Sequence, residues 1–454
     1  MLGGGTFTSQ NKVLPGTYIN VVSAVHAAGA VTNGIVAMPM TLSWGPTERV
    51  VRITKEEFEK NSLRLLGYPK AAERLLPFRE LFQNAVLLYF YRVNRNPGKA
   101  ENTYAEARYA GVRGNDLTVA IQRNAGDSSK YDVKTLLNAS VYEIQTVSTA
   151  FDLEDNEFLV FKKDAQLTET SGIPLTGGAD GGVATMEDYR AFLGQMESHS
   201  FNVLGCPSKD AAVIDEFVSY TKRMRDELGI KFQTVVFRAT KADYEGIISV
   251  ENRVTGRMPG AEALVGSAVV GKSEASAIED YELVYWTSGA EAACELNKSN
   301  TNKVYNGEYE IDVPYTQAQL EAAVKSGTFV FHQVGDDIRV LQDINSLVSF
   351  TDEKSQDFSD NQTIRILDAI GNNVAGIFSD KYMGQIPNDE AGRVSLWNDI
   401  TTYLKGLTAV RAVEPFETET VTVVQGETKR SVVASLPVTP INCMERLYMT
   451  VIVQ

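Results

Sequence analysis

Residues 201–237 read FNVLGCPSKDAAVIDEFVSYTKRMRDELGIKFQTVVF and contain the clearest structural pattern of the chain. Short apolar runs predict strands at Phe201–Leu204 and Lys231–Phe237. Between them, apolar residues at helical spacing predict one helix: Val213, Phe217, Tyr220, Met224 and Leu228. A strand, a crossover helix and a second strand favour parallel pairing, so the stretch predicts a β-α-β unit.

The ends of the predicted helices carry capping residues. Ser208 is the expected N-cap of the crossover helix, and Gly229 suits its C′ position. Upstream, Thr185 and Asp188 match a capping box, and downstream Thr316 begins another helix. Helices are therefore expected on both sides of the β-α-β unit in the sequence.

Two breaks divide the rest of the chain. Asn94–Gly98 is rich in Asn, Pro and Gly, and Asp352–Gln362 is polar without an apolar period. With a length of 454 residues, these breaks predict a multidomain α+β protein. We expect an N-terminal arm, a small β-rich N-terminal module, a central α/β domain, an α+β C-terminal module and a C-terminal arm strand, at residues 1–17, 18–98, 99–350, 363–443 and 444–454.

The C-terminal module combines few strands with two amphipathic helices, expected at Ile364–Phe378 and Val394–Val410. So few elements leave sheet edges uncovered. The sequence then ends in MERLYMTVIVQ (Met444–Gln454), which is dense in β-branched and aromatic residues. A strand at a chain end can pair with the sheet edge of a neighbouring molecule. Residues 1–17, with three early glycines, have the same extended character.

Composition argues against several classes of function. The net charge is −15 without a visible basic cluster, which argues against a protein that packages nucleic acid. No apolar run reaches the ~20 residues of a membrane span, and no secretory signal is visible, so we expect assembly in the cytoplasm. The cysteines and histidines are dispersed, which predicts small buried thiols and no zinc site: Cys206, Cys294, Cys443, His26, His199 and His332.

A phosphate-loop pattern supplies the alternative function. Residues 266–273 read GSAVVGKS and match GxxxxGKS, so Gly266, Gly271, Lys272 and Ser273 could belong to a P-loop NTPase acting as a motor or assembly factor. Pro259-Gly260 stands where a P-loop needs a long strand, and an acidic run follows the motif. The competing interpretation is a loop or a small-residue packing segment.

Three other motifs favour structural roles. Leu175–Gly182, LTGGADGG, suits a tight loop better than an anion site, because an Asp separates the glycine pairs. Asp152–Glu157, DLEDNE, is expected to be a solvated turn, with a weak cation site or a contact to a basic neighbour as the alternatives. Gly335–Asp337 suits a hairpin turn. No catalytic constellation is present, so we expect neither an enzyme nor a bound cofactor.

Motifs along nearly the whole chain resemble contractile tail sheath proteins. This family covers myophage tails, defective prophages of the PBSX type and phage-tail-like bacteriocins. The similar segments follow the family's order: GGGTFTSQNKVLPGTYINVVS (3–23), ARYAGVRGNDLTVAI (107–121), LTGGADGGV (175–183), FNVLGCPSKD (201–210), ELNKSNTNKVYNGEY (295–309), DINSLVSF (343–350), YMGQIPNDEAGR (382–393) and MERLYMTVIVQ (444–454).

The resemblance implies a central and a C-terminal sheath domain in a structural protein. Family members polymerise as stacked hexameric rings around a tail tube and contract without ATP to drive the tube through a target cell envelope. The implied partners are further copies of the chain, the tail tube protein, and baseplate and tail terminator proteins, without nucleic acid or membrane insertion. The implied location is a virion or phage-tail-like particle. An inner tail tube protein is a third, less favoured interpretation, because tube subunits are typically smaller.

The resemblance also implies roles for particular residues. Hinges are expected at Gly3–Pro15 and Ser435–Asn442, where arms leave the body. Four basic residues of the C-terminal module are candidates for facing the tube: Lys381, Arg393, Lys405 and Arg411. The arms are expected to complete the sheet of a neighbour's C-terminal module through Thr6, Phe7, Val13, Tyr18, Ile19, Leu447, Tyr448, Met449, Val451, Ile452 and Val453.

Overall fold

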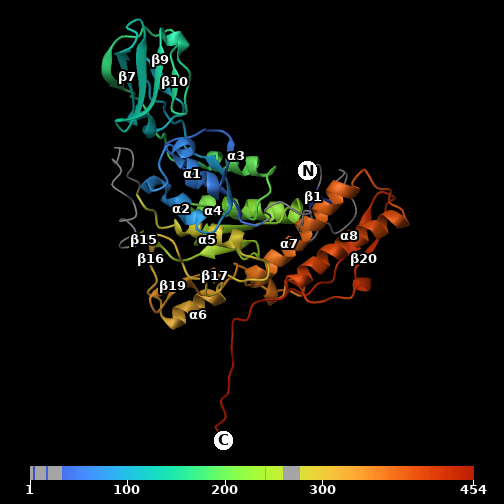
Figure 1. Ribbon diagram of the computed structural model, residues 1–454. Coiled ribbons are helices and arrows are strands. Elements are labelled where there is room, and N and C mark those ends of the chain that lie inside the picture. The colour runs from blue at the N-terminus through green and yellow to red at the C-terminus, as the bar shows by residue number, and fades with distance from the viewer. Residues whose placement is uncertain (1–3, 6–16, 19–32, 241, 259–276, 454) are drawn as a thin grey trace.

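The computed structural model describes residues 4–5, 17–18, 33–240, 242–258 and 277–453. Figure 1 shows a β-sandwich domain at the top, a central α/β domain below it and a C-terminal domain beside the central domain. The last residues extend away from all three. The prediction of a multidomain α+β protein is confirmed.

A seven-stranded sheet forms the middle layer of the central domain. The predicted β-α-β unit is confirmed, because β12 and β13 pair in parallel. All other neighbours are also parallel except β4, which runs antiparallel to β5. The strands are, in sheet order, β17 (Thr328–Phe329), β14 (Ile247–Val250), β13 (Gln233–Phe237), β12 (Val203–Gly205), β3 (Ile35–Met40), β5 (Leu87–Arg92) and β4 (Val50–Thr54).

Strands from two predicted modules share this sheet. β3 lies between β5 and β12, with Val36 opposite Leu88 on one side and opposite Val203 on the other. The predicted division at residue 98 thus separates strands that are neighbours in one sheet. Near the N-terminus, β2 (Thr17–Tyr18) pairs with β1 (Gly4–Gly5), and residues 19–32 of the expected N-terminal module lie outside the described residues.

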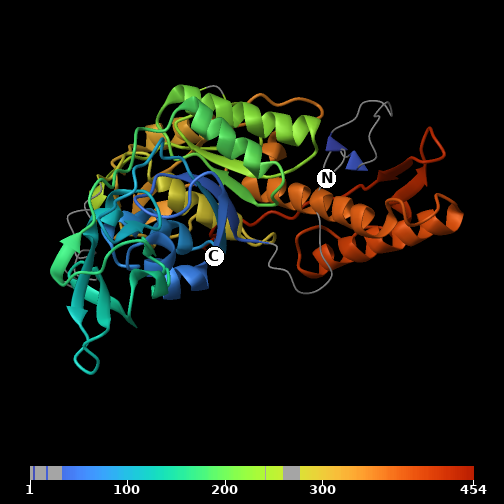
Figure 2. The same cartoon turned by 90° about the horizontal axis from the view of Figure 1, so that it is seen from above.

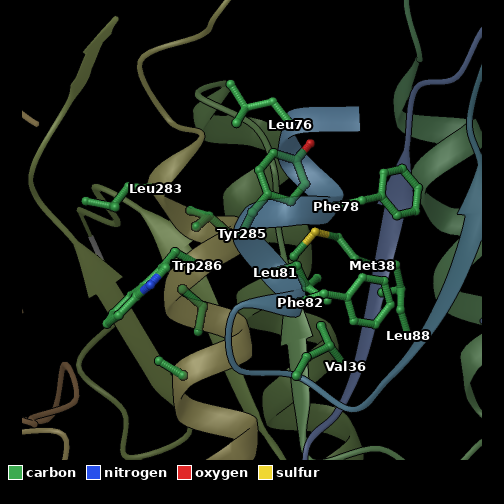
Figure 3. Packing of buried hydrophobic residues seen from close by; sticks show 14 of the residues in the cluster. Val36, Met38, Leu76, Phe78, Leu81, Phe82, Leu88, Leu283, Tyr285 and Trp286 are labelled. Carbon is green, nitrogen blue, oxygen red and sulfur yellow. The ribbon is translucent and has the colours of Figure 1, made fainter. Parts of the chain in front are cut away.

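Helices cover both faces of the sheet because its strands bury alternate side chains on each side. One cluster packs Met38 and Leu88 of the sheet against Phe78 of α2 and Trp286 of α5, as Figure 3 shows. The other face packs against Phe217 of α4 and its neighbours. The helices are α1 (Lys55–Leu66), α2 (Leu76–Phe82) and α5 (Leu283–Ala293) on the first face, and α3 (Met186–Met196), α4 (Ala211–Lys222) and the π-helical turn η4 (Arg223–Glu227) on the second.

The helix ends follow the capping predictions with one correction. Thr185 caps α3, and Gly229 adopts φ 71° after η4. Thr316 caps α6 (Gln317–Lys325). The N-cap of α4 is Asp210, whose side chain accepts from the Ala212 N–H at 2.8 Å. The prediction of Ser208 was wrong, because its Oγ accepts from the N–H of Asp210 instead.

The β-sandwich is joined to the central domain by a neck of two antiparallel chain segments. Arg95 pairs with Gly182, and Gly98 pairs with Ala179. A Cβ on Gly178 would lie 2.5 Å from the Gly111 carbonyl oxygen, so this glycine is required by close packing. The sandwich contains β6 (Ala105–Ala107), β7 (Leu117–Arg123), β8 (Tyr131–Leu137), β9 (Ser140–Val147), β10 (Leu159–Phe161) and β11 (Thr170–Pro174), with the short 3-10 turns η2 (Val112–Asp116) and η3 (Ala150–Asp152).

The C-terminal domain packs two long helices and one strand pair around its own core, seen in orange and red in Figure 2. The first helix begins earlier than predicted, because the Asp360 side chain caps it. The elements are η6 (Gln356–Ser359), α7 (Asn361–Ile377), the π-helical turn η7 (Phe378–Tyr382), α8 (Glu390–Ala409), η8 (Thr418–Thr420), β20 (Thr422–Gln425) and β21 (Val432–Ser435).

Smaller elements complete the central domain. Among them, β18 and β19 form the hairpin predicted at Gly335–Asp337, and Gly335 adopts φ 61° in its turn. The remaining elements are η1 (Glu73–Leu75), β15 (Val254–Arg257), β16 (Tyr309–Ile311), β18 (Phe331–Val334) and β19 (Asp337–Val340).

Candidate intersubunit interface

The C-terminal arm, residues 444–453, is extended and belongs to no helix or strand. It leaves the body as a single segment (Figure 1). Its side chains are exposed whether they point to one side or the other: Leu447 is 86 % exposed, Tyr448 89 % and Ile452 79 %. Exposed contiguous apolar surface marks sites of protein interaction, because water solvates it poorly. The expected role as a strand in a neighbour's sheet remains a prediction.

The segment before the arm is fixed to the body. The N–H of Cys443 donates to Gln362 Oε1 at 2.9 Å, and Asn442 Nδ2 donates to Thr363 Oγ1 at 3.0 Å. The N–H of Ile441 donates to the carbonyl of Ala412. The end of the hinge expected at residues 435–442 is therefore hydrogen-bonded to the C-terminal domain, and the arm begins beyond it.

The strands β20 and β21 form a two-stranded ribbon beside α8. Their register runs from Thr422 opposite Ser435 to Gln425 opposite Val432. Within the described part of the chain these two strands pair only with each other, so both outer edges present unpaired backbone groups. Val424 is 51 % exposed on this ribbon. Open edges of this kind are where another strand can extend a sheet.

The N-terminal candidates fall mostly outside what the structure describes. The backbone of Tyr18 lies in β2, where it pairs with Gly5 in parallel. Four other predicted arm residues lie outside the described residues: Thr6, Phe7, Val13 and Ile19.

The four candidates for facing the tube all lie in the C-terminal domain. Lys381 in η7 forms an ion pair with Asp399 at 3.2 Å. Arg393 donates to both oxygens of Asn388 at 3.1 Å. Lys405 on α8 and Arg411 just beyond it are exposed, and Arg411 adopts φ 61°. Their expected contact with a tube remains a prediction.

A polar face of α7 joins the C-terminal domain to the central domain. The apolar periodicity of the sequence could not reveal this face. Asn361, Arg365, Asp368 and Asn372 recur at helical spacing, and each bonds a residue of the central domain. The guanidinium of Arg225 binds both carboxylate oxygens of Asp368, one of them at 2.8 Å. The domain contact therefore depends on buried charges as well as on apolar packing.

The Arg365 site contains two carboxylates and one guanidinium. Arg365 donates to Glu291 at 2.6 Å and to Asp343 at 2.8 Å, and both carboxylates are fully buried. Burial, together with the charge of Asp343, raises the pKa of Glu291 to about 8. Burial opposes ionisation of Asp343 as well, but Arg365 lowers its pKa. The charges at this site are thus best balanced when Glu291 is protonated, because one guanidinium then faces one ionised carboxylate.

This proton makes stability depend on pH. The pKa of Glu291 in the folded protein lies above its unfolded value of ~4.3. Its contribution to the free energy of unfolding is therefore complete below that pH and is lost as pH rises toward about 8. We expect the free energy of unfolding of Glu291→Gln to fall less between pH 5 and pH 8 than that of the wild type. Urea denaturation at several pH values measures the difference. Glu295→Gln, an exposed neighbour, is the control, and identical profiles for all three proteins would contradict the prediction.

The motifs that suggested chemistry have local structural roles where the structure describes them. In the glycine-rich loop, the Asp180 carboxylate accepts from the Val112 N–H at 2.9 Å and from Ser43 Oγ at 2.7 Å. In the acidic segment, Asp152 bonds Thr149 within a helical turn, and the side chain of Asp155 accepts from the Phe161 N–H. Gly177 and Gly181 adopt φ 89° and 84°, and with the bonds of Asp180 they confirm the tight loop at 175–182.

The residues of the phosphate-loop pattern, Gly266, Gly271, Lys272 and Ser273, lie outside the described residues. In the part of the chain that is described, no three or more His, Cys, Asp or Glu side chains are grouped so that they could bind a metal ion. No described helix has the length and apolar character needed to cross a membrane. Two of the predicted buried thiols are confirmed, Cys206 and Cys294, whereas Cys443 is exposed.

Four family models match consecutive parts of the chain. They are the Gp18 domain III N-terminal region of tail sheath proteins at residues 33–93, the phage tail sheath β-sandwich domain at 91–180, the central domain at 182–346 and the C-terminal domain at 353–454. The β-sandwich model coincides with the domain beyond the neck, and the central model contains the β-α-β unit.

Relatives and solved structures agree with these models. The phage-like element PBSX protein XkdK of Bacillus subtilis (strain 168) is 30 % identical over 99 % of both chains. The sheath tail protein of Desulfitobacterium hafniense is 30 % identical, with a TM-score of 0.75 over 92 % of this chain and all of that one. The sheath tail protein of Listeria innocua is 32 % identical, with a TM-score of 0.76 over 91 % and 93 %.

A more distant structure shares the fold alone. The contracted helical sheath of the anti-feeding prophage is 12 % identical, with a TM-score of 0.55 over 98 % of this chain and 99 % of that one. Matches along the full length, at 30 % identity or above, assign the family directly. The chain belongs to the phage tail sheath protein family.

Proposed function

We propose that this chain is the structural subunit of a contractile tail sheath. Subunits polymerise as stacked hexameric rings around a tail tube, starting from a baseplate and ending at a terminator protein. Contraction drives the tube through a target envelope. The observation that carries the proposal is an exposed apolar arm on a chain whose C-terminal ribbon has two open edges. Assembly occurs in the bacterial cytoplasm, and the product is a virion or a phage-tail-like particle.

In this proposal, arm strands complete the ribbon of a neighbouring subunit. A two-stranded ribbon is marginally stable alone, so added strands benefit both molecules. Each main-chain hydrogen bond contributes about 0.5–1.5 kcal/mol net. The arm residues predicted from the sequence, residues 6–19 at one end and residues 447–453 at the other, supply the strands. Because successive side chains of a strand point to opposite sides, both apolar faces of the arm contact the neighbouring subunit in this proposal.

The arms also explain how rings stay connected during contraction. Subunits change their packing between two discrete arrangements while covalent tethers keep them joined. Nucleotide hydrolysis is not needed, because the extended polymer stores the free energy during assembly. The surface toward the tube comes from the C-terminal domain, with Lys381, Arg393, Lys405 and Arg411 as the proposed contacts.

Electron microscopy of the purified full-length protein tests this function. We expect hollow tubes or rings in negative stain, formed without nucleotide and without other proteins at sufficient concentration. Monomers that remain dispersed at every concentration, with or without tube protein, would contradict the proposal.

The substitution Lys272→Ala separates the sheath from the P-loop alternative. We expect unchanged tubes and an unchanged melting temperature, because Pro259-Gly260 precedes the motif in the sequence where a long strand would be needed, and an acidic run follows it. Isothermal titration with ATP and magnesium is the second measurement. Micromolar ATP binding by the wild type that disappears in the variant would favour the NTPase instead.

A further inference from the structure

The central domain contains a receptor for one residue at the base of the C-terminal arm. The hydroxyl of Thr301 donates to Glu445 Oε1 at 2.6 Å, and Gln342 Nε2 donates to Oε2 at 2.9 Å. Both carboxylate oxygens of Glu445 are therefore bound by the central domain. Hydrogen bonds to an ionised carboxylate are stronger than those between neutral groups.

Neighbouring groups of the central domain orient the Thr301 hydroxyl independently of the arm. Thr301 Oγ1 accepts from the Asp343 N–H at 2.9 Å and from Ser299 Oγ at 3.0 Å, so its single proton is left to point at Glu445. Asp343 is fully buried and is bound by Arg365 of α7. The position of the Thr301 hydroxyl is thus set by the buried network between the two domains.

Glu445 is the last residue of the chain with such a contact among the described residues. Its neighbour Met444 is completely exposed, and from Leu447 onward the arm is exposed as well. An open cavity of about 570 Å³ lies beside this contact, and its lining includes Asn302, His332 and Leu341 of the central domain as well as Met444 and Glu445. From Arg446 onward every described residue of the arm is exposed.

We infer that Glu445 is a positioning residue that sets the direction in which the arm leaves the body. The backbone of residues 441–443 binds Gln362 of the C-terminal domain, Cys443 Sγ donates to the Asn297 carbonyl of the central domain at 3.5 Å, and Glu445 binds the central domain through both carboxylate oxygens, so the base of the arm crosses from one domain to the other. A pull on the arm is consequently transmitted to the central domain through Thr301 and Gln342. This inference rests on the proposed intersubunit role of the arm.

Spin-label mobility tests the positioning role in the monomer. A label on Tyr448→Cys, in a chain that carries Cys443→Ser, reports the motion of the arm below the concentration for assembly. We expect Glu445→Ala and Thr301→Ala to increase label mobility, and Thr301→Ser, which keeps the hydroxyl, to leave it unchanged. Glu419→Ala, an exposed acid of the C-terminal domain, is the matched control. Equal mobility in Glu445→Ala and the control would overturn the inference.

Assembly is the second measurement. We expect Glu445→Ala to raise the protein concentration needed for tubes several-fold without lowering the melting temperature of the monomer. Greater mobility with unchanged assembly would overturn the coupling of Glu445 to pairing. Normal tubes from a protein without residues 447–454 would instead contradict the proposed function, so the two failures are distinguishable.

Discussion

A protein that lacks residues 447–454 should fold as a stable monomer and form neither tubes nor rings. The exposed arm residues Leu447, Tyr448 and Val453 contribute little to the core, so the melting temperature should stay within a degree or two of the wild type. In the polymer that we propose, the same deletion would remove several main-chain hydrogen bonds of about 0.5–1.5 kcal/mol each, in every subunit. Negative-stain microscopy and a thermal melt together measure both effects.

The substitution Thr450→Pro is the single-residue version of this experiment. Proline in the middle of a strand removes a ladder donor and is tolerated only at edges or bulges. Thr450→Val is the matched control, because it keeps the donor and the strand propensity. We expect tubes from the control and none from the proline variant. Tubes of normal length from Thr450→Pro, or unfolding of the truncated monomer, would show that this segment is not an intersubunit strand.

Replacing Arg225 by Met should lower the free energy of unfolding by about 3–5 kcal/mol. The change leaves the Asp368 carboxylate buried without its guanidinium and removes the bond from Arg225 to the Phe232 carbonyl. An unpaired buried charge is far more costly than the loss of an exposed ion pair. Because the pair joins η4 to α7, the loss should also loosen the C-terminal domain. Chemical denaturation measures the effect.

Arg190 offers a matched control for this prediction. It binds Glu216 through two hydrogen bonds of 3.0 and 2.8 Å, which is the same bidentate geometry, but its side chain is 62 % exposed. We expect no measurable change in stability for Arg190→Met, since water and ions replace an exposed pair. Equal losses for the two variants would mean that burial does not decide the strength of these pairs.

Features with a local signal could be predicted from the sequence. The β-α-β unit was visible because its apolar residues repeat along one segment, and the caps Thr185 and Thr316 act within three residues of their own helix. The prediction of Ser208 as the cap was wrong, because Asp210, two residues further on, is also of a type that caps helices. Only the three-dimensional backbone decides which side chain reaches the free N–H groups of α4.

Features that depend on distant pairing could not be predicted. The pairing of β3 with β12 joins residues more than 160 positions apart, and no sequence pattern in either strand identifies its partner. The polar face of α7 reads as a solvated face until its partners in the central domain are known. The receptor for Glu445 had no signal at all, because threonine and glutamine are ordinary surface residues. The arm itself was visible in composition, whereas the point at which it becomes free was not.

The neck has a consequence for how sheath proteins diversify. The chain enters and leaves the β-sandwich through two adjacent segments, since Gly98 pairs with Ala179. A module whose two ends are neighbours can be deleted, enlarged or exchanged while the host sheet keeps its connectivity. Evolution and protein engineering can therefore act on this outer module, for example by grafting a foreign domain at the neck, without redesigning the parts proposed to polymerise.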